Sequence, residues 1–214
     1  MAGKLRVGVL ASGRGSNLQA IIEAIDAGTL HAGIAVVISN KQEAQALERA
    51  RSHGIADVFL DPKLYATRTD KREAYDHAVL DILRKHDVEL VLLAGYMKIV
   101  TPVLIDAYRN RMMNIHPSLL PSFPGLEAQQ QALAWGVKTS GCTVHFVTEG
   151  VDEGPIILQA VVSVLEQDSP ETLAARILIE EHKIYPRAVQ LYAEGRLHVE
   201  GRRVRIADGA AGCV

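Results

Sequence analysis

The stretch Leu5-Arg6-Val7-Gly8-Val9-Leu10-Ala11-Ser12-Gly13-Arg14-Gly15-Ser16-Asn17-Leu18 decides the fold of this 214-residue chain. It begins with a short apolar run, continues through a polar turn with two glycines, and leads into the periodic run Leu18 to Ala27. A short apolar run is typical of a buried strand, whereas apolar residues at helical spacing are typical of an amphipathic helix. The stretch therefore predicts a strand, a glycine turn and a helix in direct succession.

The same unit returns along the first half of the chain. Further strands are predicted at Gly33 to Ser39, Val58 to Leu60 and Glu89 to Ala94, and helices at Lys41 to His53 and Thr69 to His86. Strands that alternate with helices are joined by right-handed crossovers and form a parallel sheet with helices on both faces. We therefore predict an α/β fold with a doubly wound, mostly parallel sheet of the Rossmann-like type.

The second half departs from this alternation. The runs Thr139 to Val147 and Pro155 to Leu165 predict two strands that pair antiparallel, and Leu197 to Ile206 predicts a terminal hairpin. Between them, Ser169-Pro170 begins a long helix, since serine is a favoured N-cap and proline a favoured first helical residue. We predict antiparallel additions in the C-terminal half of one continuous domain. Residues 1–110 and residues 111–214 are expected to be the two halves of this domain.

The composition is that of a soluble globular protein, with 48% hydrophobic and 22% charged residues. A net charge of -2 gives no cationic field that would gather a nucleic acid, so no such partner is expected. The two cysteines, Cys142 and Cys213, are too few and too far apart for a disulfide framework, which favours a reducing cytoplasm. No run of about 20 apolar residues is present, so no membrane association is expected.

The glycine turn lies where backbone N–H groups and the dipole of a helix favour a phosphate. A dinucleotide site would need a third glycine where Leu18 stands and an acidic residue at the end of the second strand, where Asn40 stands. A phosphate monoester held by Gly15, Ser16 and Asn17 fits this turn better. The structural alternative is a tight turn in which Ser16 and Asn17 cap the helix.

Asn114 and His116 lie two residues apart at the end of the strand predicted at Arg111 to Ile115, before a proline-rich loop. Side chains at this spacing share one face of a strand, so an amide and an imidazole can converge on one oxygen. Two donors at one oxygen suit a tetrahedral acyl-transfer intermediate. The alternative is a strand end with polar residues. Asp152, in a glycine-flanked turn, either orients His116, favours its protonated form and accepts a proton, or only forms the turn.

Other titratable residues carry weaker signals. His145 is interpreted as a structural histidine of its strand. The eight histidines show no metal-ligand spacing, so no metal is expected. A covalent serine mechanism is disfavoured because no G-x-S-x-G turn is present.

Four ordered motifs together resemble the phosphoribosylglycinamide formyltransferase family, the folate-dependent glycinamide ribonucleotide transformylases, over about residues 5 to 195. They are Ser12-Gly13-Arg14-Gly15-Ser16-Asn17-Leu18, Leu93-Ala94-Gly95-Tyr96-Met97-Lys98-Ile99, Asn114-Ile115-His116-Pro117-Ser118-Leu119-Leu120-Pro121 and Val151-Asp152-Glu153-Gly154-Pro155-Ile156. The resemblance implies the formyltransferase fold in a cytoplasmic monomer or homodimer. It also implies an enzyme of de novo purine biosynthesis that moves a formyl group from the co-substrate 10-formyltetrahydrofolate to the amine of glycinamide ribonucleotide.

The resemblance also implies a role for each half of the chain and for individual residues. Residues 1–110 would be the nucleotide- or phosphate-binding half, and residues 111–214 the catalytic and folate-binding half. Asn114 and His116 stabilise the oxyanion, Asp152 positions His116 and serves proton transfer, and no metal takes part. Gly15, Ser16 and Asn17 bind the substrate phosphate, and Glu181 contacts the sugar. The folate-binding residues are Arg72, Met97, Lys98, Ile99, Val100, Val147 and Val151. Lys98 stands where some relatives have arginine, and Gln129 where many have histidine, so no catalytic histidine is expected in that loop.

Four other functions share part of this pattern. A formyltetrahydrofolate deformylase shares the Asn-x-His and Asp pattern but carries an added N-terminal domain, and a methionyl-tRNA formyltransferase carries a C-terminal RNA-binding domain and a basic surface. A non-catalytic folate- or nucleotide-binding module would lack the catalytic residues, and all three are present. A dinucleotide-dependent oxidoreductase is disfavoured by Leu18 and Asn40.

Overall fold

The computed structural model describes residues 3–208, so Cys213 lies outside the described residues. The elements in chain order are β1 (Leu5–Ala11), α1 (Ser16–Asp26), β2 (Ala32–Ser39), α2 (Gln45–Ser52), β3 (Asp57–Phe59), the 3-10 helix η1 (Pro62–Tyr65), α3 (Lys71–Lys85), β4 (Leu90–Leu93), α4 (Pro102–Ala107), β5 (Met112–His116), α5 (Ala128–Trp135), β6 (Thr139–Phe146), β7 (Ile156–Ser163), α6 (Pro170–Ala193), β8 (Leu197–Glu200) and β9 (Arg203–Ile206).

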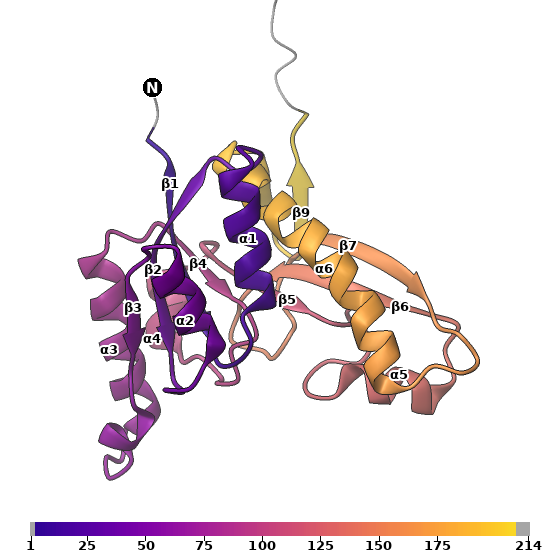
Figure 1. The fold of residues 1–214 in the computed structure, drawn as a ribbon, viewed down its shortest axis with the longest axis horizontal. Coiled ribbons are helices and arrows are strands. Elements are labelled where there is room, and N and C mark those ends of the chain that lie inside the picture. The colour runs from indigo at the N-terminus through magenta and orange to yellow at the C-terminus, as the bar shows by residue number, and fades with distance from the viewer. Residues whose placement is uncertain (1–2, 209–214) are drawn as a thin grey trace, which may run out of the picture.

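All these strands belong to one sheet with the order β3-β2-β1-β4-β5-β6-β7-β9-β8. The first five strands of this order pair parallel, whereas β6 pairs antiparallel with both β5 and β7. The terminal hairpin of β8 and β9 joins β7 through β9 (Figure 1). The predicted α/β class, the mostly parallel sheet and the antiparallel additions are confirmed. The division into a 1–110 half and a 111–214 half stays a prediction.

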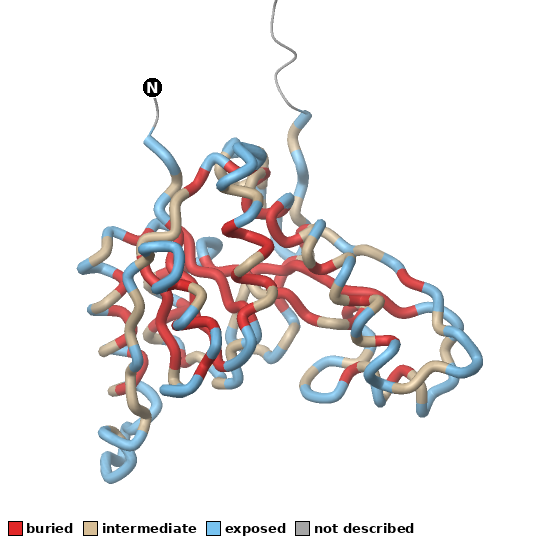
Figure 2. Tube along the Cα trace, viewed as in Figure 1, coloured by how far each residue is buried: buried red, intermediate tan, exposed pale blue. Residues whose placement is uncertain are grey.

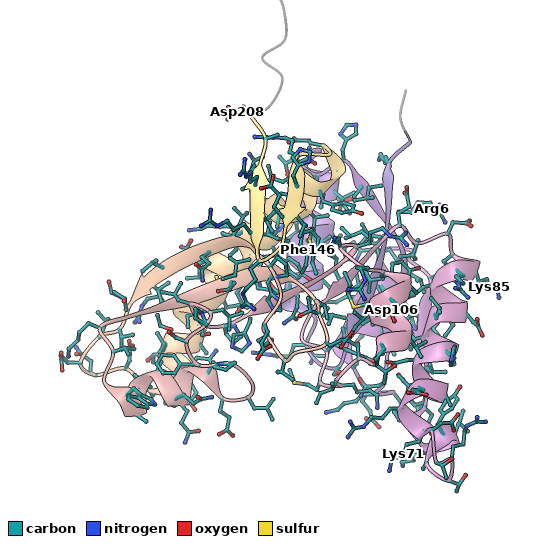
Figure 3. The ribbon with its side chains drawn as sticks, turned by 180° about the vertical axis from the view of Figure 1, so that it is seen from behind. Arg6, Lys71, Lys85, Asp106, Phe146 and Asp208 are labelled. Atoms are coloured by element: carbon teal, nitrogen blue, oxygen red, sulfur yellow. The ribbon has the colours of Figure 1, made fainter. Side chains whose placement is uncertain are left out.

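Helices cover both faces of the parallel part of the sheet (Figures 1 and 2). One buried cluster joins the sheet to α1, α2 and α6, with Leu18, Leu47 and Val189 among its members. A second cluster joins the opposite face to α3 and α4 through residues such as Tyr75 and Leu104. Seen from behind, α3 lies along the outside of the molecule, with Lys71 and Lys85 at its ends (Figure 3). Two apolar faces explain why the parallel strands are apolar along their whole length.

The parallel strands create a switch in the direction of winding. Chain order runs outward from β1 to β2 and β3 on one side and to β4 and β5 on the other. The turn after β1 and the connection after β4 therefore begin side by side at the carboxyl edge of the sheet. In open α/β sheets this is the place where ligands bind.

Several helix ends differ from their predictions. Helix α2 begins at Gln45 and not near Lys41. Helix α1 has Gly15 as its N-cap and no side-chain capping bond, so the expectation that Ser16 and Asn17 cap it is wrong. Helix α6 has a complete capping box in which Ser169 and Thr172 serve each other's backbone N–H. No helix among residues 3–208 combines the length and apolar character needed to cross a bilayer.

Candidate active site

The predicted catalytic residues come together at the centre of the sheet. Strand β5 carries Asn114 and His116, and the turn between β6 and β7 carries Asp152. The Asp152 carboxylate lies with Oδ2 at 3.3 Å from His116 Nδ1 and with Oδ1 at 3.4 Å from Asn114 Nδ2. An amide, an imidazole and a carboxylate thus form one cluster, although Asp152 follows Asn114 by 38 positions. The spacing in the sequence predicted the pairing of Asn114 with His116, and only the resemblance implied that Asp152 lies beside His116.

The turn that carries Asp152 is held by a close approach of backbone to backbone. Asp152 has a φ of 55°, in the left-handed region that aspartate tolerates better than most residues. A Cβ at Gly154 would collide with the carbonyl oxygen of Phe146, and Phe146 N–H donates to Pro155 O at 2.9 Å. Gly154 thus lets the chain turn back on β6 and so aims Asp152 at β5.

His145 belongs to this cluster, although the sequence pattern indicated a structural role. It pairs with Asn114 across β5 and β6, is 2% exposed, and has Nδ1 at 2.9 Å from Phe146 O. That carbonyl accepts the Nδ1 hydrogen, so the Nε2 lone pair accepts the Asn114 amide at 3.2 Å. Nε2 also lies 3.6 Å from Asp152. A register shift between Val144 and His145 marks a bulge, a feature that often re-aims side chains near active sites.

The loop after β5 occupies two polar groups of the cluster. His116 Nε2 lies 2.8 Å from the carbonyl oxygen of Phe123, and the N–H of Gly125 donates to Asp152 Oδ2 at 2.8 Å. Both contacts are made by backbone atoms, so the loop sequence gives no sign of them. The loop therefore covers the hydrogen-bonding groups that were predicted to face a substrate.

Burial lowers the pKa of His116 below its ordinary value, while the Phe123 carbonyl and the Asp152 charge act in the opposite direction. Asp152 therefore does favour the protonated imidazole, as expected, but desolvation lowers the pKa of His116 by more than the Asp152 charge raises it. Burial of Asp152 raises its pKa, yet contacts with His145, Gly125 and His116 outweigh this, and the pKa lies below its ordinary value. Desolvation therefore favours the neutral imidazole, whereas the two acceptors that face its ring nitrogens, Phe123 O and the Asp152 carboxylate, favour the protonated one.

We expect the pKa of His116 to fall further in the Asp152→Asn variant. The carboxylate contributes a charge that raises this pKa, and the amide has none. Titration of the imidazole signals by NMR in both proteins measures the difference directly. An unchanged His116 pKa would show that the two side chains do not interact in solution, and the signal of exposed His198 serves as the internal control.

The predicted phosphate turn is held open at the start of α1. Gly15 has a φ of 69°, and a Cβ there would lie 2.9 Å from Ala46 of α2. Arg49 donates to the carbonyl of Arg14 at 2.9 Å and so fixes the turn from outside. Within the described part of the chain, no backbone acceptor outside α1 takes the N–H groups of residues 16, 17 and 18. Three free donors at a helix N-terminus suit a phosphate.

Glu181, which the resemblance assigns to the substrate sugar, lies beside this turn. Its Oε2 accepts a hydrogen bond from Asn17 Nδ2 at 2.7 Å, and Glu181 is 7% exposed. Burial raises the pKa of Glu181, and the Asn17 amide opposes the rise. The other amide atom, Asn17 Oδ1, is buried without a partner in the described structure. A buried acid and an unpaired amide oxygen beside three free N–H groups can receive hydroxyls next to a phosphate.

The predicted folate-binding residues lie on two loops and one helix. Met97 and Ile99 are each 63% exposed and Val151 is 51% exposed, so each presents an apolar side chain to solvent. Val100 and Val147 pack against the buried cluster below α3 and α4. The other two carry charge. Lys98 places its ammonium 4.6 Å from the centre of the Tyr75 ring, and Arg72 is exposed near the start of α3.

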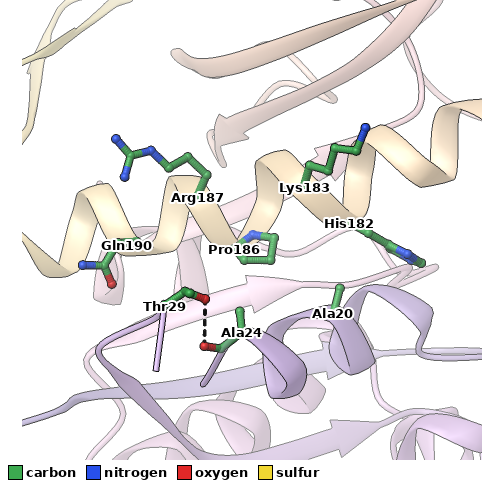
Figure 4. A pocket seen from close by; sticks show the side chains of 8 residues that line it. All are labelled: Ala20, Ala24, Thr29, His182, Lys183, Pro186, Arg187 and Gln190. Atoms are coloured by element: carbon green, nitrogen blue, oxygen red, sulfur yellow. Dashed lines mark hydrogen bonds between the residues drawn. The ribbon is translucent and has the colours of Figure 1, made fainter. Parts of the chain in front are cut away.

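Two cavities differ in their distance from the predicted site residues. One of about 480 Å³ reaches Asp152 and is lined by Leu120, Pro121, Pro124, Val151, Asp152, Glu153, Gly154, Ile156 and Arg202. The other, of about 320 Å³, lies between α1 and α6 and contains no predicted site residue (Figure 4). Over residues 3–208, no cluster of three or more His, Cys, Asp or Glu side chains is placed to hold a metal ion.

The sequence of this chain is similar to those of known formyltransferases. The family model for formyl transferase matches residues 5–189. The phosphoribosylglycinamide formyltransferase of Escherichia coli (strain K12) is 45% identical over 193 residues, or 90% of this chain and 89% of that protein. The trifunctional purine biosynthetic protein adenosine-3 of Chironomus tentans is 45% identical over 93% of this chain, which spans only 14% of that protein.

The fold comparison gives the same result. The crystal structure of glycinamide ribonucleotide transformylase 1 from Symbiobacterium toebii has a TM-score of 0.93 and 56% identity to this chain, and the match covers 97% of this chain and 96% of that one. Both ends of the matched family region lie within the described residues, and the region contains all the predicted site residues. The chain therefore belongs to the formyl transferase family and, within it, to the phosphoribosylglycinamide formyltransferases.

Proposed function

We propose that this chain transfers the formyl group of 10-formyltetrahydrofolate to the amine of glycinamide ribonucleotide in de novo purine biosynthesis. The observation that carries the proposal is the convergence of Asn114, His116 and Asp152 around one point. The open phosphate turn lies at the carboxyl edge of the same sheet. The chain would act in the cytoplasm on small molecules, as a monomer or homodimer.

The chemistry assigned to the three residues follows from their atoms. The substrate amine attacks the formyl carbon, and the charge that develops on the formyl oxygen is stabilised by N–H groups of Asn114 and His116. Asp152 accepts the proton that the amine loses, and a proton reaches the folate nitrogen as its bond to the formyl carbon breaks. His116 Nε2 contacts Phe123 O at 2.8 Å in this structure, so the oxyanion would take the place of that carbonyl.

The two substrates would approach from different elements. Gly15, Ser16 and Asn17 would bind the phosphate of the ribonucleotide, and Glu181 its sugar. The folate would lie against the 97–100 segment and the turn near Val147 and Val151, with Arg72 near its glutamate tail. Residues 1–110 would thus provide most of the nucleotide site, and residues 111–214 the catalytic residues and part of the folate site.

One assay separates this function from the alternatives. Purified protein is mixed with 10-formyltetrahydrofolate, with glycinamide ribonucleotide, or with both, and the release of tetrahydrofolate is followed. A transferase releases it only when both are present, a deformylase releases it from the folate alone, and a binding module releases none. A spectral change with a nicotinamide cofactor would instead indicate an oxidoreductase.

We expect the double variant Ser16→Ala, Asn17→Ala to bind the ribonucleotide roughly tenfold more weakly, with folate affinity nearly unchanged. The change removes two polar side chains beside the turn, including the Asn17 amide that donates to Glu181. The turn itself should keep its conformation, because that conformation depends on Gly15. Calorimetric titration with each ligand measures the two affinities. Equal losses for both ligands would contradict the assignment of this turn to the nucleotide.

A further inference from the structure

The connection from β4 to α4, residues 95–101, forms one side of the switch point. It presents the exposed side chains of Met97 and Ile99 to solvent. It follows β4 directly and runs beside the turn that follows β1. A segment that exposes two large apolar side chains needs to be held from behind by other parts of the chain.

The first of its two attachments is Ser12, at the carboxyl end of β1. The Ser12 hydroxyl accepts the N–H of Met97 at 2.8 Å and donates to Asn40 Oδ1 at 2.6 Å. The N–H of Ser12 donates to Gly95 O at 3.0 Å. Ser12 is 4% exposed, so these bonds are sheltered from water. Ser12 is also the first residue of the phosphate turn, so it joins that turn directly to the 95–101 segment.

The second attachment is Asp76, in the first half of α3. Its Oδ2 accepts the N–H of Thr101 at 2.6 Å, and Asp76 is 2% exposed. Burial raises the pKa of Asp76, while the N–H of Thr101 and the charge of Lys98 oppose this rise. Lys98 itself lies over the ring of Tyr75, the residue before Asp76. The far end of the segment is therefore fixed to α3 by a carboxylate that is taken almost fully out of water.

A buried carboxylate is destabilising unless its partners compensate, and here one short backbone contact is its principal partner. An apolar side chain at position 76 would fill the same space on the helix without this penalty. The bond to Thr101 is local in its effect, since it fixes only the segment that leads into α4. These features indicate that residue 76 is used to set the conformation of the segment.

We propose that Ser12 and Asp76 are positioning residues that hold the 95–101 segment in the conformation that receives the folate co-substrate. Asp76 acts on the folate side alone. Ser12 acts on both substrates, because the phosphate turn begins at the same residue. This inference rests on the proposed function for the identity of the ligand, but the attachments themselves do not depend on it.

The proposal predicts different kinetic effects for the two positions. We expect Asp76→Ala to raise the KM for 10-formyltetrahydrofolate about tenfold or more, with the KM for the ribonucleotide within about twofold of the parent. Asp76→Asn retains an oxygen that accepts the Thr101 N–H and should restore most of the loss. Ser12→Ala should raise both KM values. Ser140→Ala removes a buried hydroxyl that has no partner in the described structure, and should leave both KM values unchanged.

Two further measurements do not require turnover. Amide hydrogen exchange should become faster at Met97 in Ser12→Ala and at Thr101 in Asp76→Ala. Binding of tetrahydrofolate, followed by calorimetry, should weaken in both. Equal changes of the two KM values in Asp76→Ala, an unchanged KM for the folate, or the absence of rescue by Asp76→Asn would overturn the proposal.

The same measurements separate this inference from the proposed function. If the parent protein transfers no formyl group, yet exchange and tetrahydrofolate binding respond as described, the attachments stand and the proposed reaction falls. If transfer is normal and the variants match the parent, the reaction stands and the attachments are purely structural. If Asp76→Ala does not fold, the test depends on Ser12→Ala. Weaker binding of tetrahydrofolate by that variant then supports the proposal, and unchanged binding overturns it.

Discussion

Asp152→Asn is expected to lower kcat by a factor of about 10³ or more, while the protein folds and binds the ribonucleotide as the parent does. General base catalysis is worth roughly 10² to 10⁴ in rate. The amide has nearly the same shape as the carboxylate but cannot take a proton from the attacking amine. Its oxygen can still accept the N–H of Gly125, which Asp152 Oδ2 accepts at 2.8 Å, so the turn should remain in place. Steady-state kinetics and calorimetric titration with the ribonucleotide measure the two properties.

Glu153→Gln provides the matched control for this variant. Glu153 is the neighbouring carboxylate in the same turn, and it is exposed. The substitution removes the same charge from the same turn, and kcat should stay within about twofold of the parent because a charge in solvent is well screened. Near-normal turnover in Asp152→Asn would remove Asp152 from the mechanism. A similar loss in both variants would show that only the charge of the turn matters.

The parallel part of the fold was predictable because its signals are local. The strand, glycine turn and helix at Leu5 to Ala27 are set by apolar spacing within a few residues, and the same holds for α3 and β4. The start of α2 was wrong because residues 41–44 continue the polar composition of the helix but form a turn before it. Spacing alone does not report where a helix obtains its first hydrogen bond.

The catalytic cluster was predictable only in part. Asn114 and His116 share a face because they are two residues apart, which the sequence states directly. Asp152 and Glu181 were placed by resemblance to known motifs, since no local pattern brings them to β5 or to α1. The family predicted from these motifs is confirmed by the identity and structural similarity of its members.

The role of His145 was hard to predict because it depends on the register between β5 and β6. It faces Asn114 only through the antiparallel pairing of β5 with β6, and the irregularity beside it lies in the other pairing of β6, with β7. A one-residue shift in register would turn His145 to the opposite face. The alternation of the strand around His145 was visible, but its partner was not.

Asn114→Ala is expected to lower kcat by a factor of about 10² to 10³, with both KM values within a few fold of the parent. Loss of one oxyanion donor has an effect of this size in other enzymes. In this structure Asn114 Nδ2 contacts His145 at 3.2 Å and Asp152 at 3.4 Å. The second contact is long for a hydrogen bond, so this N–H can turn to a developing oxyanion at little cost. Single-turnover kinetics would measure the chemical step apart from binding.

The competing explanation for such a loss is that Asn114 acts only by holding Asp152 and His145 in place. His145→Ala tests this, since it removes the acceptor of the Asn114 amide but leaves the amide itself in the site. If Asn114 is an oxyanion donor, His145→Ala should lose far less activity than Asn114→Ala. Equal losses, together with a changed pKa of His116 in both variants, would instead assign Asn114 to the support of its neighbours. Asn114 and His145 are direct partners across β5 and β6. Comparing the two variants therefore distinguishes donation by Asn114 to the reacting oxygen from a structural contact between Asn114 and His145.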